Sequence, residues 1–453
     1  MHENRVTIIG AGLAGSLLAI YLAKRGIQCD VFESRSDIRR SSIYGGRSIN
    51  LALSDRGILA LREIGMDSYM LSEAVPMHGR MIHSADGTLR MLPYSGRSGE
   101  YINSVSRAGL NIALLDEAAK QDEVRLFFNE QCIHFDCEAG VAEFSSGRKV
   151  RGQTVIATDG AGSAVRNSML DGGVDGFRFD VSKLSHGYKE LHIPPANGSF
   201  AMEKNVLHIW PRDKFMMIAL PNFDGSFTCT LFVAHEGENS FEEIESGDYD
   251  ASGDRNSAIR RFMSDNFGDV LDLMPEYETD FITNPTGTLA TVKCFPWQVG
   301  GRALLLGDSA HAIVPFYGQG MNCSFEDCRV LDQLVGEMGA DWENVFTRYC
   351  ELRKENTDAI ADMAEENFYE MRDAVADPVF LRKRELETKL EQTYPDYFSK
   401  YSMVTFREDL PYSIAKRVGN AQDRLLMDLC REIEDVSSLD LNAVMKKISE
   451  VNA

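Results

Sequence analysis

The sequence predicts an α/β fold: a Rossmann-type dinucleotide-binding domain with an inserted, mainly antiparallel β-sheet domain and a C-terminal helical region. Three observations predict this fold. The apolar strand Val6–Ile9 runs into the G-x-G-x-x-G motif Gly10–Gly15, and a second apolar strand, Ala303–Leu306, ends in Gly307-Asp308. Runs of β-branched and aromatic residues fill the middle of the chain. Helical periodicity dominates from Trp342 to the end.

Each glycine of the first motif has its own physical task. Gly10 permits a tight turn, Gly12 lets the backbone approach a pyrophosphate, and Gly15 lets the following helix pack close to the strand. The N-terminus of that helix, residues 16–25, then offers unpaired N–H groups to the phosphates. Glu33, at the end of the next strand, can accept hydrogen bonds from ribose hydroxyls and would repel a 2′-phosphate. The motif therefore favours bound FAD or NAD over NADP, with a plain tight turn as the alternative.

The second motif predicts the flavin side of the same site. Asp308 would place its carboxylate on the ribityl hydroxyls of a flavin, and Gly318 and Gly320 would allow close approach of the backbone. Gly320-Met321-Asn322 opens a helix whose positive end could face the N1/C2 carbonyl side of the isoalloxazine. Such a helix favours a flavin that reacts with oxygen after reduction. His311 could serve as a base or a ligand, but a single histidine in a turn is more often structural.

The amino-acid composition limits the kinds of molecule that the protein is expected to bind. Lys and Arg number 47 against 69 Asp and Glu, and the net charge of -22 disfavours nucleic acids and anionic membrane surfaces. The nine cysteines lack the paired spacing of a zinc site, so we expect reduced thiols, a cytoplasmic protein and no metal. We interpret Cys323 and Cys328 as packing residues on a helix.

The domains are expected to interleave along the chain. The FAD-binding domain takes residues 1–75, 102–180 and 285–375, the substrate domain takes 76–101 and 181–284, and a helical region takes 376–453. Gly160-x-Gly162 follows a strand, but Val165 occupies the place of the closing glycine. A nicotinamide cofactor would therefore have no domain of its own and would bind only transiently.

Asp86-Gly87 predicts a hairpin between Arg80 and Tyr94. A two-residue Asp86-Gly87 turn would place Arg80 and Tyr94 on opposite faces. A three-residue Asp86-Gly87-Thr88 loop would make them direct cross-strand partners on one face. If both bind one carboxylate, we expect the longer loop or a bulge. The alternative for Arg80 is a surface strand charge.

Three motifs make the chain resemble the FAD-dependent aromatic hydroxylases: Gly10–Gly15, Asp159–Arg166 and Gly307–Asn322. Within that family it is similar to the branch that hydroxylates L-kynurenine, over nearly the whole chain. The matching segments are Gly46–Leu53, His78–Met81, His186–Leu191, Leu207–Pro211, Pro315–Asn322 and Tyr401–Arg407. The resemblance implies that NADPH reduces the flavin, O2 forms a C4a-hydroperoxide, and its distal oxygen enters C3 of L-kynurenine.

The resemblance also implies roles for residues. No catalytic acid or base is expected, because the aniline nitrogen already activates the ring and the protein has only to orient it and exclude water. The cofactor-binding residues would be Gly10, Gly12, Leu13, Gly15, Glu33, Ala52, Arg107, Cys132, Asp159, Asp308, Gly320, Met321 and Asn322. The amino-acid end of the substrate would meet Arg80, Tyr94, Asn367 and Tyr401, with Glu370 nearby. The ring pocket would be made by Leu207, Leu220, Phe232, Pro315 and Phe316, the last two near the flavin.

Helical periodicity supports two of these assignments independently. Asn367 and Glu370 fall on the apolar stripe of their helix, with Ile360, Met363 and Met371, and a buried polar group needs a partner. A hydrated helix edge is the alternative. Glu370 could pair with the substrate ammonium or fix nearby loops.

Two features depart from the family pattern. Tyr317 stands where several relatives carry histidine, and the polar end Met445–Glu450 replaces the membrane-associated segment of eukaryotic relatives, so no membrane anchor is expected. Two alternatives stay open. One is a flavin hydroxylase for another aromatic acid, and the other is a non-catalytic flavin-binding protein. Oligomeric state does not follow from the sequence.

Overall fold

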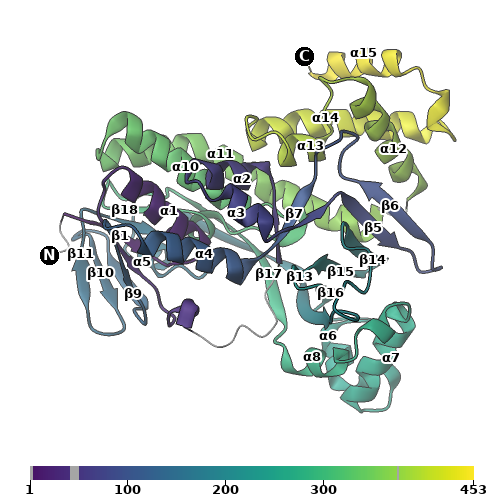
Figure 1. Ribbon diagram of the computed structural model, residues 1–453, viewed down its shortest axis with the longest axis horizontal. Coiled ribbons are helices and arrows are strands. Elements are labelled where there is room, and N and C mark those ends of the chain that lie inside the picture. The colour runs from purple at the N-terminus through teal and green to yellow at the C-terminus, as the bar shows by residue number, and fades with distance from the viewer. Residues whose placement is uncertain (1–3, 41–49, 375–376, 453) are drawn as a thin grey trace.

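The computed structural model describes residues 4–40, 50–374 and 377–452. Figure 1 shows a strand and helix region at the left around β1 and α1, a large sheet towards the centre, and helices α12 to α15 at the upper right. Residues 46–49 of the matching segment Gly46–Leu53 lie outside the described residues.

The dinucleotide-binding region is built on a five-stranded parallel sheet with the strand order β18-β12-β1-β2-β8. Its strands are β1 (Val6–Ile9), β2 (Cys29–Phe32), β8 (Val124–Phe127), β12 (Thr154–Ala157) and β18 (Ala303–Leu305). The first two, β12 and β18 are buried along their whole length, as expected for a parallel sheet covered on both faces. The helices that contribute to its hydrophobic core include α1 (Leu13–Lys24), α4 (Arg107–Ala119) and α10 (Gly320–Met338). The predicted Rossmann-type region is confirmed.

Two small sheets flank this region. One contains β9 (Cys132–Asp136), β10 (Val141–Phe144) and β11 (Lys149–Arg151), and packs with α5 (Ala164–Asp171). The other contains β3 (Asn50–Leu53), β7 (Ile102–Ser106) and β4 (Val75–Met77), next to α2 (Asp55–Glu63) and α3 (Asp67–Ser72). The N-terminus of α2 lies against that of α10, since Ser54 donates its amide to Asn322 Oδ1 at 3.0 Å.

The inserted region is a seven-stranded sheet with the order β17-β13-β16-β15-β14-β5-β6. Its strands are β5 (Gly79–His83), β6 (Leu89–Pro93), β13 (Arg178–Ile193), β14 (Leu207–Arg212), β15 (Phe215–Pro221), β16 (Phe227–Ala234) and β17 (Gly287–Phe295). All neighbours are antiparallel except β5 and β14. Strands from the two predicted inserts, 76–101 and 181–284, thus join one sheet. The domain boundaries themselves stay a prediction.

The two faces of this sheet serve different purposes. On one face, Trp210, Phe227 and Leu231 pack against α6 (Phe241–Ser246), α7 (Arg255–Phe267) and α8 (Tyr277–Thr283) in a core of their own. Figure 1 shows these helices below the sheet. The opposite face carries Leu207, Ile218 and Phe232 and looks toward the C-terminal helices. The alternation of side chains along each strand therefore separates a structural face from a face that is free to line a cavity.

The hairpin between β5 and β6 differs from both predicted turns. Its loop is Ala85-Asp86-Gly87, closed by a hydrogen bond from the Ser84 amide to the Thr88 carbonyl at 3.0 Å. Arg80 pairs with Leu92, so the predicted direct pairing of Arg80 with Tyr94 is wrong, as is the two-residue turn. In three-residue loops the left-handed residue comes last, and Gly87, with φ of 82°, takes that position.

Arg80 and Tyr94 nevertheless lie on the same face. The Tyr94 amide donates to the His78 carbonyl at 3.1 Å, and His78 is two residues from Arg80. The two side chains are therefore diagonal neighbours, with the Arg80 guanidinium carbon 5.8 Å from the centroid of the Tyr94 ring. The expectation of a three-residue loop is confirmed, but the loop begins one residue earlier than predicted, so the residue opposite Arg80 is Leu92, two residues before Tyr94.

Helices make up the last third of the chain. Besides α10, they are α9 (Asp308–His311), α11 (Trp342–Tyr369), a π-helical turn (Glu370–Ala374), α12 (Pro378–Thr393), α13 (Lys400–Thr405), α14 (Tyr412–Arg431) and α15 (Leu441–Asn452). Short 3₁₀ turns occur at Ile38–Arg40, Asp248–Asp250, Leu271–Leu273, Pro315–Tyr317 and Val436–Ser438. Of the described helices, none has the length and apolar character needed to cross a membrane.

A pair of histidines lies on the structural face of β5 and β14. His83 Nε2 is 2.9 Å from His208 Nδ1, and His208 Nε2 is 2.7 Å from the Glu203 carbonyl. Burial, reinforced by His208 and opposed by Asp269, lowers the pKa of His83 from 6.5 to about 4. Neutral His83 therefore contributes stability above pH 6.5 that is lost as the pH falls toward about 4.

We expect a His83→Gln variant to lose less stability on acidification than the wild type. The difference in Tm between wild type and variant should shrink as the pH is lowered from about 7.5 to about 5, because only the wild type protonates His83 on unfolding. Thermal unfolding followed by circular dichroism measures this difference. A constant difference over that range would contradict the depressed pKa.

Candidate active site

A cavity of about 430 Å³ lies between the parallel-sheet region and the open face of the seven-stranded sheet. Of the predicted cofactor-binding residues, it is lined by Gly12, Leu13, Ala52, Arg107, Asp308, Gly320 and Met321. Of the predicted substrate-binding residues, it is lined by Arg80, Tyr94, Leu207, Leu220, Phe232, Pro315, Phe316 and Tyr401. One cavity therefore brings together both motifs and the hairpin, which are far apart in the sequence.

The first glycine motif has the geometry of a phosphate-binding turn. A Cβ on Gly10 would lie 2.5 Å from the Thr158 carbonyl oxygen, and one on Gly15 would lie 2.0 Å from the Gly10 carbonyl oxygen. A Cβ on Gly12 would meet nothing within 4 Å. Gly10 and Gly15 are thus required by the protein's own packing. Gly12 faces open space at the start of α1, where an anion would meet free N–H groups.

Glu33 is tied to this turn. Its carboxylate accepts hydrogen bonds from the Ala11 amide at 2.9 Å and from the Arg35 amide and Nε at 3.0 and 2.9 Å. Burial would raise the pKa of Glu33, but the hydrogen bonds from Arg35 and Ala11 lower it below its usual value. Glu33 is therefore ionised at neutral pH and fixes the backbone of the turn through its hydrogen bond with the Ala11 amide.

Asp308 lies across the cavity from the first turn. Its carboxylate is exposed to the cavity at the start of α9. Because protein surrounds the cavity, burial raises the pKa of Asp308, and electrostatic interactions with His311 and Arg107 partly offset this rise. Arg107 comes from the N-terminus of α4 and also lines the cavity.

The backbone of residues 307–322, which we call the 307–322 turn, is held by Asn322. The Asn322 amide nitrogen donates to the carbonyls of Ala52 and Gly318, both at 2.8 Å. Gly318 has φ of 68°, and a Cβ there would lie 2.9 Å from the Ala52 Cβ. Asn322 thus does not line the cavity and instead fixes the backbone that does.

Asp159 fixes the other end of the same turn. One carboxylate oxygen accepts a hydrogen bond from Ser309 Oγ at 2.9 Å and the other from the Ala164 amide at 2.8 Å. The Arg166 guanidinium donates to the Ser309 carbonyl at 3.0 Å. Cys132 is buried in the core nearby. Asp159 and Cys132 lie outside the lining of the cavity, as do Gly10, Gly15 and Glu33.

His311 is part of a buried ion cluster. Its Nε2 lies 2.6 Å from Asp327 Oδ2, and the Arg353 Nε donates to Asp327 Oδ1 at 2.6 Å. Burial would raise the pKa of Asp327, but His311 and Arg353 lower it to about 2. His311, Cys323 and Asp327 bring potential metal ligands within 4.8 Å of one another. The Arg353 guanidinium bonds to both Asp327 and Cys323 and already supplies the cation there, which supports a structural role for His311.

Three stacked tyrosines and Arg80 close one end of the cavity; we call them the tyrosine rim. The rings of Tyr94 and Tyr401 stack with centroids 5.1 Å apart, and those of Tyr401 and Tyr317 with centroids 5.5 Å apart. The Arg80 guanidinium carbon lies 5.2 Å from the Tyr401 centroid. Arg80 is only 8% exposed. Tyr317, whose role the sequence left open, is thus a wall of the cavity.

Two donors of the rim lack partners among the described residues. Arg80 Nε and the Tyr94 hydroxyl are buried without a hydrogen bond, which would be costly unless a ligand or water met them. Burial raises the pKa of Tyr94, and that of Tyr317 and Tyr401 too, so all three phenols remain protonated at neutral pH. Together, Arg80 and Tyr94 offer a cation and an O–H donor to an anion.

Asn367 and Glu370 lie behind the rim rather than on the main cavity. The Asn367 amide donates to the Phe316 carbonyl at 2.6 Å, and Glu370 Oε1 lies 3.7 Å from an Arg80 nitrogen. Asn367 is buried, as its place on the apolar stripe predicts. The hydrated-edge alternative is wrong for Asn367. Glu370 is partly exposed.

A small polar cavity of about 30 Å³ separates these residues from an ion network. Asp423 lies 2.6 Å from Lys383 and 2.7 Å from Lys400, and Glu387 lies 2.7 Å from Arg384. That volume is large enough to hold water. The charges behind the rim are therefore largely neutralised by one another.

Several residues that line the cavity were not predicted. They are Asn50, Met77, Ile102, Tyr188, Glu190, Ile218, Thr230, Thr288 and Met371 among others. Strand alternation could have found two of them, because Ile218 precedes Leu220 and Thr230 precedes Phe232 by two residues.

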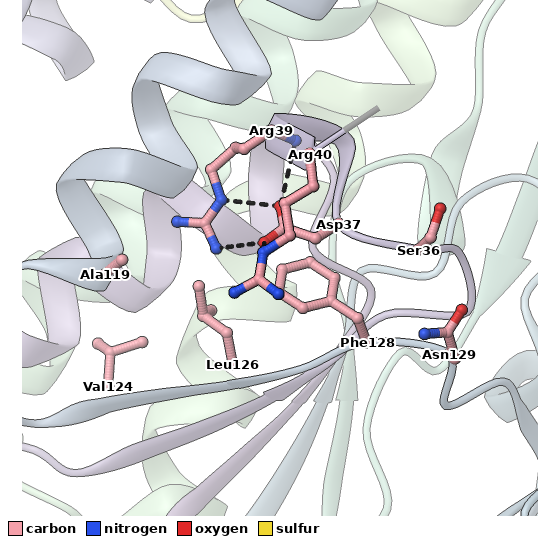
Figure 2. A pocket seen from close by; sticks show the side chains of 9 residues that line it. All are labelled: Ser36, Asp37, Arg39, Arg40, Ala119, Val124, Leu126, Phe128 and Asn129. Atoms are coloured by element: carbon pink, nitrogen blue, oxygen red, sulfur yellow. Dashed lines mark hydrogen bonds and ion pairs between the residues drawn. The ribbon is translucent and has the colours of Figure 1, made fainter. Parts of the chain in front are cut away.

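A second hollow of about 530 Å³ opens at the edge strand β8. Figure 2 shows Arg39, Arg40 and Asp37 above Phe128 and Leu126. Arg39 binds Asp37 through two hydrogen bonds of 2.8 Å, so its charge is paired. The hollow contains no residue of the predicted site, and the cavity between the sheets remains the candidate active site.

A family model described as FAD binding domain matches residues 3–244 and 274–343. Among solved structures, the tetrameric form of 2-methyl-3-hydroxypyridine-5-carboxylic acid oxygenase has a TM-score of 0.66 at 19% identity, over 85% of this chain and 97% of its own. HpxO from Klebsiella pneumoniae, complexed with FAD, has a TM-score of 0.67 at 21% identity, over 84% and 95%. These likenesses confirm the fold.

Relatives of known name are much more similar. A kynurenine 3-monooxygenase from Myxococcus xanthus is 46% identical over 99% of this chain and 95% of its own length. One from Dictyostelium discoideum is 42% identical over 96% of this chain and 95% of its own. The similarity thus extends over both sheets and the C-terminal helices.

We expect alanine at Gly12 and at Gly15 to have different consequences. Gly12→Ala should weaken FAD binding by at least about tenfold and leave unfolding of the FAD-free protein nearly unchanged, because only the cofactor would meet the new methyl group. Gly15→Ala should lower both the affinity for FAD and the thermal stability of the FAD-free protein, since its methyl group clashes with the Gly10 carbonyl. Flavin fluorescence titration and thermal unfolding measure the two effects. Unchanged FAD affinity in Gly12→Ala would contradict the placement of the pyrophosphate.

Proposed function

The chain belongs to the kynurenine 3-monooxygenase family and carries its FAD binding domain, and we propose that it hydroxylates L-kynurenine to 3-hydroxy-L-kynurenine with NADPH and O2. The observation that carries this proposal is a pair of buried donors, Arg80 Nε and the Tyr94 hydroxyl, which have no hydrogen-bond partner among the described residues and lie at the end of an apolar cavity. A carboxylate is the group that satisfies both.

The shape of L-kynurenine fits the distribution of groups in the cavity. Its carboxylate would bind Arg80 and Tyr94, and its aromatic ring would lie against Leu220, Phe232 and Phe316, whose ring centroid is 4.9 Å from that of Phe232. The ring would then face the 307–322 turn, where Pro315 is exposed to the cavity. This pose puts the charged end far from the flavin and the ring close to it.

The residues behind the rim act by positioning. Asn367 holds the Phe316 carbonyl, and so fixes the ring wall, while Glu370 holds Arg80. Both were predicted to bind substrate, and the contacts favour an indirect role for them. Tyr317 supports Tyr401 by stacking and completes the rim.

Bound FAD supplies the redox chemistry, accepting hydride equivalents from NADPH and activating O2 for transfer to the ring. The residues of the cavity orient the substrate and exclude water, and its lining offers no histidine among the described residues. Asp308, Arg107, Gly12, Leu13, Ala52, Gly320 and Met321 would hold the cofactor. NADPH would dock transiently, since the chain has a single complete dinucleotide motif.

The chemical state of the cysteines supports the proposed cytoplasmic location. All nine are free thiols, and eight of them are buried. Unpaired cysteines in this number are typical of a reducing compartment. The proposed partners are small molecules alone, namely L-kynurenine, NADPH and O2.

The decisive assay supplies purified holoenzyme with NADPH and L-kynurenine and measures 3-hydroxykynurenine and hydrogen peroxide separately. We expect hydroxylated product in near-equal amount to the NADPH consumed. Peroxide without hydroxylated product would contradict the proposal. Hydroxylation of salicylate or 4-hydroxybenzoate instead of L-kynurenine would identify a hydroxylase for another aromatic acid. If none of these compounds stimulates NADPH oxidation by the FAD-bound protein, the protein is a non-catalytic flavoprotein.

We expect Arg80→Lys to raise KM for L-kynurenine by about 10- to 100-fold, because lysine loses the Nε donor of a buried charge-assisted contact. Tyr94→Phe should raise it by about tenfold through loss of one O–H donor. Arg90→Lys is the matched control, since Arg90 is an exposed arginine on the same hairpin. Steady-state kinetics measure these KM values. An unchanged KM in Arg80→Lys would show that the substrate carboxylate does not bind at Arg80.

A further inference from the structure

The Arg56 side chain lies at the junction of three parts of the molecule. It starts from α2, and it is 2% exposed. Its Nε donates to the Val404 carbonyl at 3.0 Å, and its terminal nitrogens donate to the carbonyls of Arg407, at 2.9 Å, and Leu410. One guanidinium thus satisfies three carbonyls, one in the last turn of α13 and two in the chain segment that joins α13 to α14.

The same guanidinium reaches the helix that ends the 307–322 turn. A terminal nitrogen lies 3.2 Å from Glu326 Oε1 on α10. The guanidinium carbon lies 3.9 Å from the centroid of the Tyr412 ring, and the Tyr412 hydroxyl donates to Gln319 Oε1 at 2.9 Å. Gln319 belongs to the turn and precedes the first residue of α10.

The segment that Arg56 holds also carries part of the tyrosine rim. Tyr401 lies in α13, one turn before Val404, and stacks between Tyr94 and Tyr317. A guanidinium is suited to this position because its planar fork presents five N–H donors in fixed directions, which an ammonium group cannot reproduce.

We propose that Arg56 is a positioning residue that couples the 307–322 turn to the tyrosine rim. It links the backbone that follows Tyr401 to the first turns of α10. The 307–322 turn, which would face the flavin, and the tyrosine rim, which would face the amino-acid end of the substrate, are thereby held in a fixed position relative to each other. The identity of Tyr401 as a substrate contact rests on the proposed function, but the coupling itself concerns the protein's own structure.

Amide hydrogen exchange of the substrate-free holoenzyme, together with FAD affinity, tests the proposal. In Arg56→Lys we expect exchange to accelerate about tenfold in both the 319–326 and the 399–412 peptides, and the Kd for FAD to rise several-fold. In turnover, the peroxide fraction should rise as the rim loosens. Failure of the proposed function would appear separately, as wild-type protein that makes no hydroxylated product.

Arg97→Lys is the matched control. Arg97 binds the carbonyls of Tyr394, Pro395 and Tyr397 and stacks 4.0 Å from the Phe398 centroid, without a described contact to the 307–322 turn. It should accelerate exchange near 394–412 and leave the 319–326 peptide and the FAD affinity unchanged.

The proposal is overturned if Arg56→Lys affects only the 399–412 peptide and leaves the 319–326 peptide and FAD affinity at wild-type values. Should Arg56→Lys fail to fold, Tyr412→Phe decides, because it removes only the hydroxyl that meets Gln319. A roughly threefold change in exchange in both peptides supports the coupling, and no change in either overturns it.

Discussion

The 307–322 turn keeps its shape through hydrogen bonds with three polar side chains: Asn322 within the turn, and Asn367 and Asp159 from elsewhere in the chain. Asn322 holds Gly318 and Ala52, Asn367 holds the Phe316 carbonyl, and Asp159 holds Ser309. Each bond satisfies a polar group that would otherwise be costly to bury. The turn joins both halves of the cavity, so its fixed backbone determines where a flavin and a ring can meet.

The division of the seven-stranded sheet into two faces makes a rigid wall possible. One face is fully packed against α6, α7 and α8, and so the other can leave a cavity without loss of the sheet. Polar and charged groups are likewise divided between the inside of the cavity and the region behind the tyrosine rim. Within the described part of the chain, Arg80 and Tyr94 each keep a donor without a partner inside the cavity, whereas Lys383, Lys400 and Asp423 neutralise one another behind the rim. Under the proposed function, a ligand carboxylate would therefore be directed to this one end of the cavity.

Local motifs in the sequence predicted the parallel-sheet region and the lining by Gly12 and Asp308, because glycine geometry and strand ends are short-range properties. Such local reasoning could not predict the register of the hairpin, because the loops 85–87 and 86–88 have nearly the same composition. They differ in which loop position Gly87 occupies, and its left-handed conformation fits the last position. Periodicity identified the buried face that contains Asn367. It could not show that Phe316, rather than a ligand, is its partner, because that contact depends on the packing of α11 against a distant turn.

Resemblance supplied what periodicity could not, namely the grouping of Arg80, Tyr94 and Tyr401. The structure places these three residues in one stack and adds Tyr317 to it. The most direct measurement of the central claim is a crystal structure of the holoenzyme with L-kynurenine bound. We predict its carboxylate within about 3 Å of Arg80 and the Tyr94 hydroxyl, with the ring against Phe232. A carboxylate bound elsewhere, with Arg80 and Tyr94 still unpartnered, would contradict the account.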